Sequence, residues 1–216
     1  MSVTRAITVL VHGLWVHGVV MGLQRCYLAR MGFDAVCYSY PSVRLSLTAN
    51  ADRLAQFARK LAEPRIHWVG HSLGGLVILR MLEREPALPP GRVVLLGVPY
   101  RDSFAGRVLA GNTLGARALG RSMREWLAAQ KPAHYPGRDI GVIAGSIGVG
   151  LGRVVARGLP VPNDGVVAVT ETELAAARDR IVLPVNHIGM LLSRSVARQS
   201  GAFLRDGKFD HQAGMS

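Results

Sequence analysis

A serine stands between glycines where an apolar run gives way to a helix-forming segment. Residues 70–75 read GHSLGG; they follow the apolar stretch 66–69 and overlap the start of the predicted helix 73–82. Glycines two positions before and after a serine allow a sharp strand-to-helix turn that exposes the hydroxyl, and a helix N-terminus favours developing negative charge. The pattern predicts that Ser72 is a nucleophile; the alternative is a glycine-rich turn with an incidental serine.

A hydroxyl is a weak nucleophile that needs a general base, and seven histidines are available. His187 follows the predicted strand 181–185, so we expect it at the same sheet edge as Ser72. His71 adjoins the serine, which predicts that its side chain points elsewhere, and His12 belongs to a separate loop. Position therefore favours His187 as the base.

The base in turn needs a carboxylate that fixes its tautomer. Asp164 lies ahead of His187 in the turn-forming sequence PNDGVV of residues 162–167. Asp139 and Asp179 adjoin the starts of predicted strands, at the opposite edge of the sheet. We therefore expect Asp164 to orient His187; the alternative is a turn aspartate that binds its own backbone.

Attack on a carbonyl also needs N–H donors for the oxyanion. One expected donor is the residue after the nucleophile, Leu73, and the second comes from the loop after the first predicted strand. In that loop residues 12–15 read HGLW, where Gly13 permits a tight turn and Leu14 N–H is the expected donor. Trp15 is a candidate for lining the acyl pocket, with packing on the first helix as the alternative.

Strand-like and helix-like segments alternate along the chain, which predicts a parallel sheet with right-handed crossovers. Thr48 is the expected N-cap of a helix that ends before Pro64. Residues 101–137 form either an ordinary crossover helix or a cap over the site. The other predicted elements are strands at 6–11, 35–40, 66–69, 92–96, 140–144 and 181–185 and helices at 19–31, 73–82 and 190–203.

The composition, with 216 residues of which 49% are hydrophobic and 19% charged, is typical of one globular domain spanning 1–216. Cys26 and Cys37 lack the spacing of a metal or redox site, and we expect both to be reduced core residues. No uninterrupted apolar stretch of about 20 residues occurs, so we expect no membrane span and a cytoplasmic location.

The net charge of +12 is scattered along the chain, and no nucleic-acid-binding motif accompanies it. We therefore expect no nucleic-acid partner. The charge predicts a solvated basic surface, with weak contact to an anionic membrane surface as the alternative.

Two other kinds of site fit the sequence poorly. The glycine-rich segment 145–152 lacks the order and the later acid of a dinucleotide site, so we expect a flexible loop there. No histidine pair has HExxH or related spacing, so a metal hydrolase is not expected.

Several motifs together resemble the small single-domain bacterial lipases and esterases of the α/β-hydrolase superfamily. They are HGLW at 12–15, GHSLGG at 70–75, GVPY at 97–100, NDGVV at 163–167 and NHIGMLL at 186–192. The resemblance spans nearly the whole chain. It implies a compact α/β fold of about six mostly parallel strands flanked by helices on both faces. It also implies no cofactor, and hydrolysis of carboxylic esters through an acyl-enzyme.

The same superfamily includes thioesterases and acyltransferases, and these are alternatives on the same machinery. A catalytically inactive hydrolase-fold binding protein is the competing class. The expected partner is a small-molecule or lipid acyl ester, and no obligate protein partner is expected.

Overall fold

The computed structural model describes residues 6–132, 134–149 and 157–212. Its centre is a six-stranded sheet in the order β2-β1-β3-β4-β5-β6, and every neighbouring pair of strands is parallel. The strands are β1 (Ile7–Val11), β2 (Asp34–Tyr38), β3 (Ile66–His71), β4 (Val93–Leu96), β5 (Ile140–Gly145) and β6 (Asp179–Leu183). The predicted fold class is confirmed, and the carboxyl ends of all six strands lie at one edge of the sheet.

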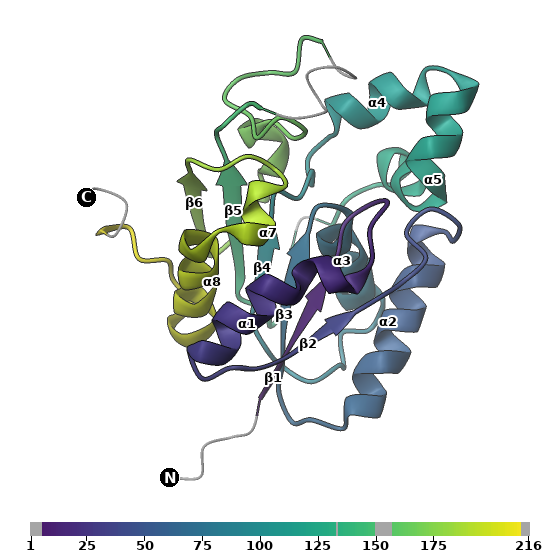
Figure 1. The fold of residues 1–216 in the computed structure, drawn as a ribbon. Helices are drawn as coiled ribbons and strands as arrows, with labels where there is room; N and C mark the ends of the chain where they lie inside the picture. Colours follow the sequence, from purple (N-terminus) through teal and green to yellow (C-terminus); the bar gives the residue numbers. More distant parts are fainter. Residues whose placement is uncertain (1–5, 133, 150–156, 213–216) are drawn as a thin grey trace, which may run out of the picture.

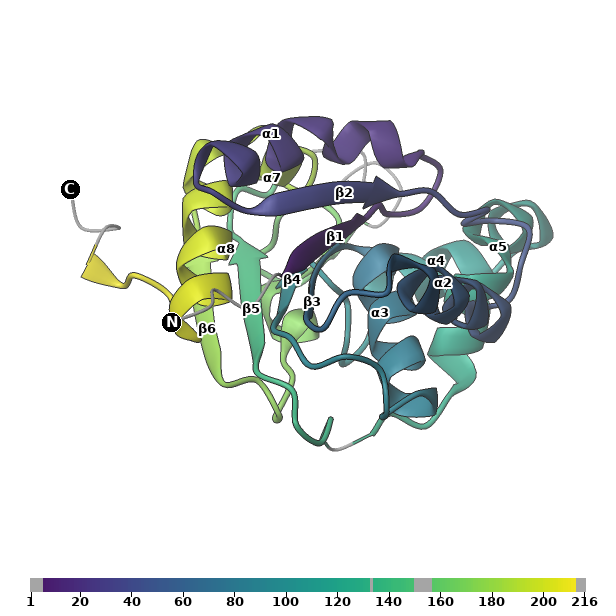
Figure 2. The ribbon, with the colours of Figure 1, turned by 90° about the horizontal axis from the view of Figure 1, so that it is seen from below.

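Helices cover both faces of this sheet (Figures 1 and 2). One face carries α1, α7 and α8, and the other carries α2, α3 and α5. The helices are α1 (Gly22–Arg30), α2 (Leu47–Leu61), α3 (Leu73–Arg84), α4 (Phe104–Ala110), α5 (Thr113–Ala128), α7 (Gly189–Leu192) and α8 (Arg194–Asp206), with 3-10 turns η1 (Gly18–Met21) and η2 (Val169–Thr172). Within the described ranges, every helix is too short or too polar to cross a bilayer.

Burial explains the apolar sequences of the central strands. Every residue of β1, β3, β4 and β5 is buried, as expected of strands that are covered on both faces. Successive side chains of β3 enter different cores: Trp68 packs in the cluster that contains Trp126, and Val69 packs in the cluster that contains Phe203. Because side chains alternate along a strand, β3 contributes residues to one core on each face of the sheet.

The start of α2 differs from the prediction. Ser46, not Thr48, is the N-cap, and its Oγ accepts a hydrogen bond from Ala49 N (3.1 Å). The N–H groups of Leu47 and Thr48 donate instead to the carboxylate of Glu125 in α5 (2.7 and 3.2 Å). Thr48 therefore lies inside the first turn because a distant carboxylate completes the hydrogen bonding of that turn.

Residues 101–137 connect β4 to β5 through α4 and α5. The apolar residues at helical spacing, Leu119, Met123 and Trp126, lie on the buried side of α5, which packs against α2 and α3. At Gly120 the helix is interrupted, with a φ of 76°. Figure 1 shows α4 beyond the carboxyl ends of the strands.

Two predictions, for the last helix and for the cysteines, differ from the structure. The single helix expected at 190–203 is divided into α7 and α8 by Ser193, whose extended backbone places its Oγ to cap Val196 N (3.2 Å). Cys26 is exposed on the outer side of α1, and Cys37 is only partly buried, although both thiols are free. Cys26 is therefore not a core residue, whereas Cys37 packs against the core, where partial burial raises the pKa of its thiol.

Candidate active site

Ser72 lies directly after β3 and directly before α3, with a φ of 51° and a ψ of −125°. A positive φ in a non-glycine residue is strained, and such strain is concentrated at functional turns. Ser72 N–H donates to Leu96 O at the end of β4 (2.9 Å). A Cβ on Gly74 would overlap the carbonyl groups of Val11 and His12, so this position of the turn needs glycine. Residues 70–75 therefore have the strand-turn-helix context that their sequence predicts.

Asp164 and His187 form a buried pair. His187 Nδ1 lies 2.7 Å from Asp164 Oδ2, and His187 N–H donates to Asp164 O (2.8 Å). Asp164 is 1% exposed, and its Oδ1 accepts hydrogen bonds from Val166 N (2.9 Å) and Val167 N (2.7 Å). A carboxylate can only accept, so the proton of a neutral His187 ring lies on Nδ1 and Nε2 has a free lone pair.

The end of β4 brings the three predicted residues together. Ser72 is hydrogen-bonded to Leu96, and a Cβ on the next residue, Gly97, would lie 2.9 Å from Asp164 Oδ2 and 3.1 Å from His187 Nδ1. Among the described residues, however, Ser72 Oγ has no hydrogen-bond partner, and it is not hydrogen-bonded to His187. Such contacts are often long in unliganded enzymes and shorten when substrate binds.

His71 contacts the histidine that follows the last strand, contrary to the prediction that it points elsewhere. Its Nε2 lies 3.0 Å from His187 O, and the two rings are 4.5 Å apart. Burial, with a smaller contribution from His187, lowers the pKa of His71 to about 3, so the ring is neutral near pH 7. The motif around Ser72 does not indicate this contact, because His187 lies 116 residues further along the chain.

The loop after β1 is fixed by a buried histidine and a tyrosine. His12 Nδ1 lies 2.8 Å from Gly13 O, and His12 Nε2 accepts a hydrogen bond from Tyr40 N (3.2 Å). Tyr40 donates its hydroxyl to His12 O (2.9 Å) and stacks on the ring at 4.4 Å. Burial lowers the pKa of His12, which keeps the proton on Nδ1 alone.

The predicted oxyanion donors adjoin this loop and the serine turn. A Cβ on Gly13 would lie 3.2 Å from the Cβ of Ser72, so the loop runs beside the serine. In the described part of the chain, neither Leu14 N–H nor Leu73 N–H has a hydrogen-bond acceptor. Both groups are therefore available as donors.

Trp15 continues the same loop. It has a φ of 63°, its N–H donates to Ser42 Oγ (3.2 Å), and its side chain is 56% exposed. Its indole Nε1–H donates to Ala118 O in α5 (2.7 Å). The indole is thus directed toward the segment 101–137.

Glu171 is a buried acid near the site that the sequence motifs did not indicate. One carboxylate oxygen accepts Ala168 N–H (2.7 Å) and the other accepts Phe104 N–H, so Glu171 joins the loop after Asp164 to the start of α4. Burial raises the pKa of its carboxyl group. No local sequence pattern identifies this residue, because its second partner is distant in the chain.

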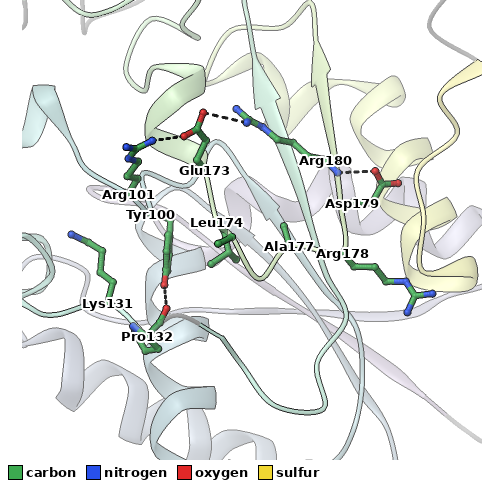
Figure 3. A pocket seen from close by; sticks show the side chains of 11 residues that line it. Tyr100, Arg101, Lys131, Pro132, Glu173, Leu174, Ala177, Arg178, Asp179 and Arg180 are labelled. Carbon is green, nitrogen blue, oxygen red and sulfur yellow. Dashed lines mark hydrogen bonds and ion pairs between the residues drawn. The ribbon is translucent and has the colours of Figure 1, made fainter.

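A cavity of about 810 Å³ lies away from the predicted triad (Figure 3). Its lining includes Tyr100, Lys131 and Leu174 but none of the three triad residues. Arg101 and Arg180 at its rim both contact the carboxylate of Glu173 (2.5 and 3.6 Å). Each of the three arginines in the lining is thus paired with an acid, Arg101 and Arg180 with Glu173 and Arg178 with Asp139.

The structure gives little support to a dinucleotide site or a metal site in the part of the chain that it describes. Of the glycine-rich segment 145–152, residues 150–152 lie outside the described residues. Within 6–132, 134–149 and 157–212, no group of three or more His, Cys, Asp or Glu side chains is arranged to hold a metal ion.

Solved structures similar to this chain share its fold at low sequence identity. Lipase BlEst2 of Bacillus licheniformis in its mature form has a TM-score of 0.71 and 18% identity, over 94% of this chain and 92% of that one. The metagenomic carboxyl esterase MGS0156 has a TM-score of 0.64 and 18% identity, over 87% and 66%. The RedJ thioesterase of prodiginine biosynthesis in Streptomyces coelicolor has a TM-score of 0.60 and 14% identity, over 93% and 86%.

No curated protein sequence matches the chain significantly. The family model described as the alpha/beta hydrolase family matches residues 8–209, which is nearly the whole chain. With its parallel sheet and strained serine turn, the chain belongs to the alpha/beta hydrolase family.

Proposed function

We propose that the chain is a serine hydrolase that cleaves carboxylic esters through an acyl-enzyme. Ser72 is the nucleophile, His187 the general base and Asp164 the acid that orients it. The observation that carries this proposal is the 2.7 Å contact between His187 Nδ1 and Asp164 Oδ2, at the sheet edge where Ser72 occupies its strained turn.

In the acylation step, Ser72 Oγ attacks the ester carbonyl carbon as its proton passes to His187 Nε2. The Ser72 hydroxyl must first approach the imidazole, because the two groups are not hydrogen-bonded in the free protein. The buried carboxylate of Asp164 stabilises the imidazolium that forms. His187 then gives the proton to the leaving alcohol oxygen as the C–O bond breaks, which leaves an acyl ester on Ser72.

In the deacylation step, His187 takes a proton from water, and the resulting hydroxide attacks the acyl carbon. Collapse of the tetrahedral intermediate breaks the bond to Ser72 Oγ, which recovers its proton from His187. In both steps the N–H groups of Leu14 and Leu73 bind the oxyanion, and the ordered loop around His12 holds the first of them in place.

For the substrate, we propose a small-molecule or lipid ester with its acyl chain near Trp15. The hydrogen bond from Trp15 Nε1 to Ala118 O supports a cap role for residues 101–137, because it ties the oxyanion loop to α5. A thioester substrate or acyl transfer needs the same residues. The cytoplasmic location stays a prediction.

Fluorophosphonate labelling tests the proposal directly, because only an activated serine reacts with the probe. We expect the wild-type chain to be labelled and to hydrolyse p-nitrophenyl butyrate, and Ser72→Ala to do neither. Ser146→Ala, a serine after β5 at the same edge, is the matched control and keeps both activities. Labelling that persists in Ser72→Ala contradicts the assignment, and a folded wild-type chain that is never labelled favours the inactive binding protein. Parallel assays with butyryl thioesters separate esterase from thioesterase.

A further inference from the structure

A basic groove of about 390 Å³ lies between α1 and α8, on the face of the sheet opposite α2 and α3. Its lining contains three arginines and no carboxylate: Tyr27, Arg30, Met31, Arg194, Ser195, Ala197 and Arg198. Arg194 lies 5.7 Å over the ring of Tyr27. Among the described residues, none of the three arginines forms an ion pair with an acid, whereas all three arginines of the cavity in Figure 3 do. The groove therefore presents uncompensated positive charge.

Exposed aliphatic side chains continue this surface toward the catalytic edge. Val19 is 81% exposed, Ile188 and Leu192 are each 59% exposed, and Leu23 is 38% exposed. The start of α1 is joined to α7 because Gln24 Nε2 donates to Met190 O (2.7 Å) and Ser193 O (2.9 Å). Ile188 directly follows the proposed base. We call this surface the α1–α8 shoulder, made of Val19, Leu23, Arg30, Ile188, Leu192, Arg194 and Arg198.

We propose that the α1–α8 shoulder docks on a bilayer that contains anionic phospholipids. The arginines of the groove bind headgroup phosphates, since a guanidinium donates two parallel hydrogen bonds to a phosphate. The four aliphatic side chains enter the boundary between headgroups and acyl chains, where amphipathic surfaces bind. Docking itself does not require the proposed chemistry. If the proposed function also holds, docking makes esters that reside in the bilayer the substrate class.

The mixture of side chains favours a membrane over a nucleic acid. Both partners present phosphates to arginines, but a nucleic-acid backbone offers no apolar layer for Val19, Ile188 and Leu192. Salt should weaken docking, because screening reduces the attraction between exposed charges.

Co-sedimentation with vesicles tests the proposal, with the full chain carrying Ser72→Ala so that no lipid is consumed. We expect binding to phosphatidylcholine vesicles that contain phosphatidylglycerol and much weaker binding to pure phosphatidylcholine. Arg30→Glu/Arg194→Glu/Arg198→Glu should lower the vesicle partition coefficient at least tenfold. The matched control, Arg44→Glu/Arg53→Glu/Lys60→Glu, makes the same charge change on α2 and the loop before it and should leave the partition coefficient within twofold of the parent.

The aliphatic part is tested by Val19→Ser/Leu192→Ser, which should weaken vesicle binding while the arginines remain. With Ser72 intact, all three multiple variants should hydrolyse soluble p-nitrophenyl butyrate at the wild-type rate. That assay shows that they are folded and separates a failure of docking from a failure of the proposed chemistry. Unchanged vesicle binding in the shoulder arginine variant, or equal binding to both kinds of vesicle, overturns the proposal. So does arginine-dependent binding to an oligonucleotide without any binding to vesicles.

Discussion

The imidazole of His71 lies 4.5 Å from that of His187, and His71 Nε2 lies 3.0 Å from the carbonyl oxygen of His187. A carbonyl oxygen only accepts, so His71 carries its proton on Nε2. Because burial keeps the ring neutral, the residue next to the proposed nucleophile holds the backbone of the proposed base without placing a positive charge beside it.

The titration of His71 should appear in the pH dependence of stability. Its pKa falls from 6.5 in the unfolded chain to about 3 in the folded chain. Between these values the unfolded chain binds more protons, so the free energy of unfolding falls as the pH falls. His71→Gln removes the titration and retains a donor for His187 O. Urea unfolding between pH ~4 and ~6 should give a slope shallower than wild type by about 1.4 kcal/mol per pH unit. Parallel curves for the two proteins would contradict a neutral buried His71.

Gly97 should be intolerant of a methyl group. Its φ is 55°, and a Cβ there would lie 2.9 Å from Asp164 Oδ2 and 3.1 Å from His187 Nδ1. Gly97→Ala should therefore displace the pair and lower kcat/KM for p-nitrophenyl butyrate about 10²-fold.

Gly137→Ala is the matched control for that variant. Gly137 has a φ of 69°, but a Cβ there meets nothing within 4 Å. The variant should lose about 1 kcal/mol of stability from backbone strain and keep wild-type activity. Equal losses of activity in the two variants would assign the effect of Gly97→Ala to strain alone.

Asp164→Asn should preserve the fold and lower kcat about 10⁴-fold, because an amide favours the wrong tautomer of His187. Asp139→Asn provides the comparison, since this acid pairs with Arg92 and Arg178 at the opposite edge of the sheet. Steady-state kinetics of both variants give kcat, and circular dichroism shows whether the fold is preserved. A near-wild-type Asp164→Asn enzyme would mean that another acid orients the base.

Glu171→Gln should destabilise the protein by about 1–3 kcal/mol, because one of two buried N–H groups loses its acceptor. Glu173→Gln, at a partly exposed ion pair with Arg101, should change the free energy of unfolding by less than about 1 kcal/mol. Urea denaturation distinguishes the two. If both variants had the same stability, the carboxylate of Glu171 would not be joining the loop to α4.

Local pattern was enough to predict the sheet, because its central strands are mostly apolar and each is followed by a turn signal. Ser72 and His187 follow β3 and β6 closely, and Asp164 lies in a turn motif within the connection between β5 and β6. Side chains that depend on distant partners were not predictable in this way. Ser46 replaces Thr48 as the N-cap because Glu125 completes the turn, and the exposure of Cys26 depends on which side of α1 meets the sheet. His71 contacts His187 only because the loop after β6 returns across the ends of β5 and β4 to the end of β3.

The carboxylate of Glu125 that accepts the N–H groups of Leu47 and Thr48 also bears on how the protein assembles during translation. The ribosome synthesises α2 before it reaches residue 125. Until then, water must hydrate those two peptide groups, and the first turn of α2 frays. The hydrogen bonding of the first turn of α2 is therefore completed only after α5 has been synthesised and has packed against α2.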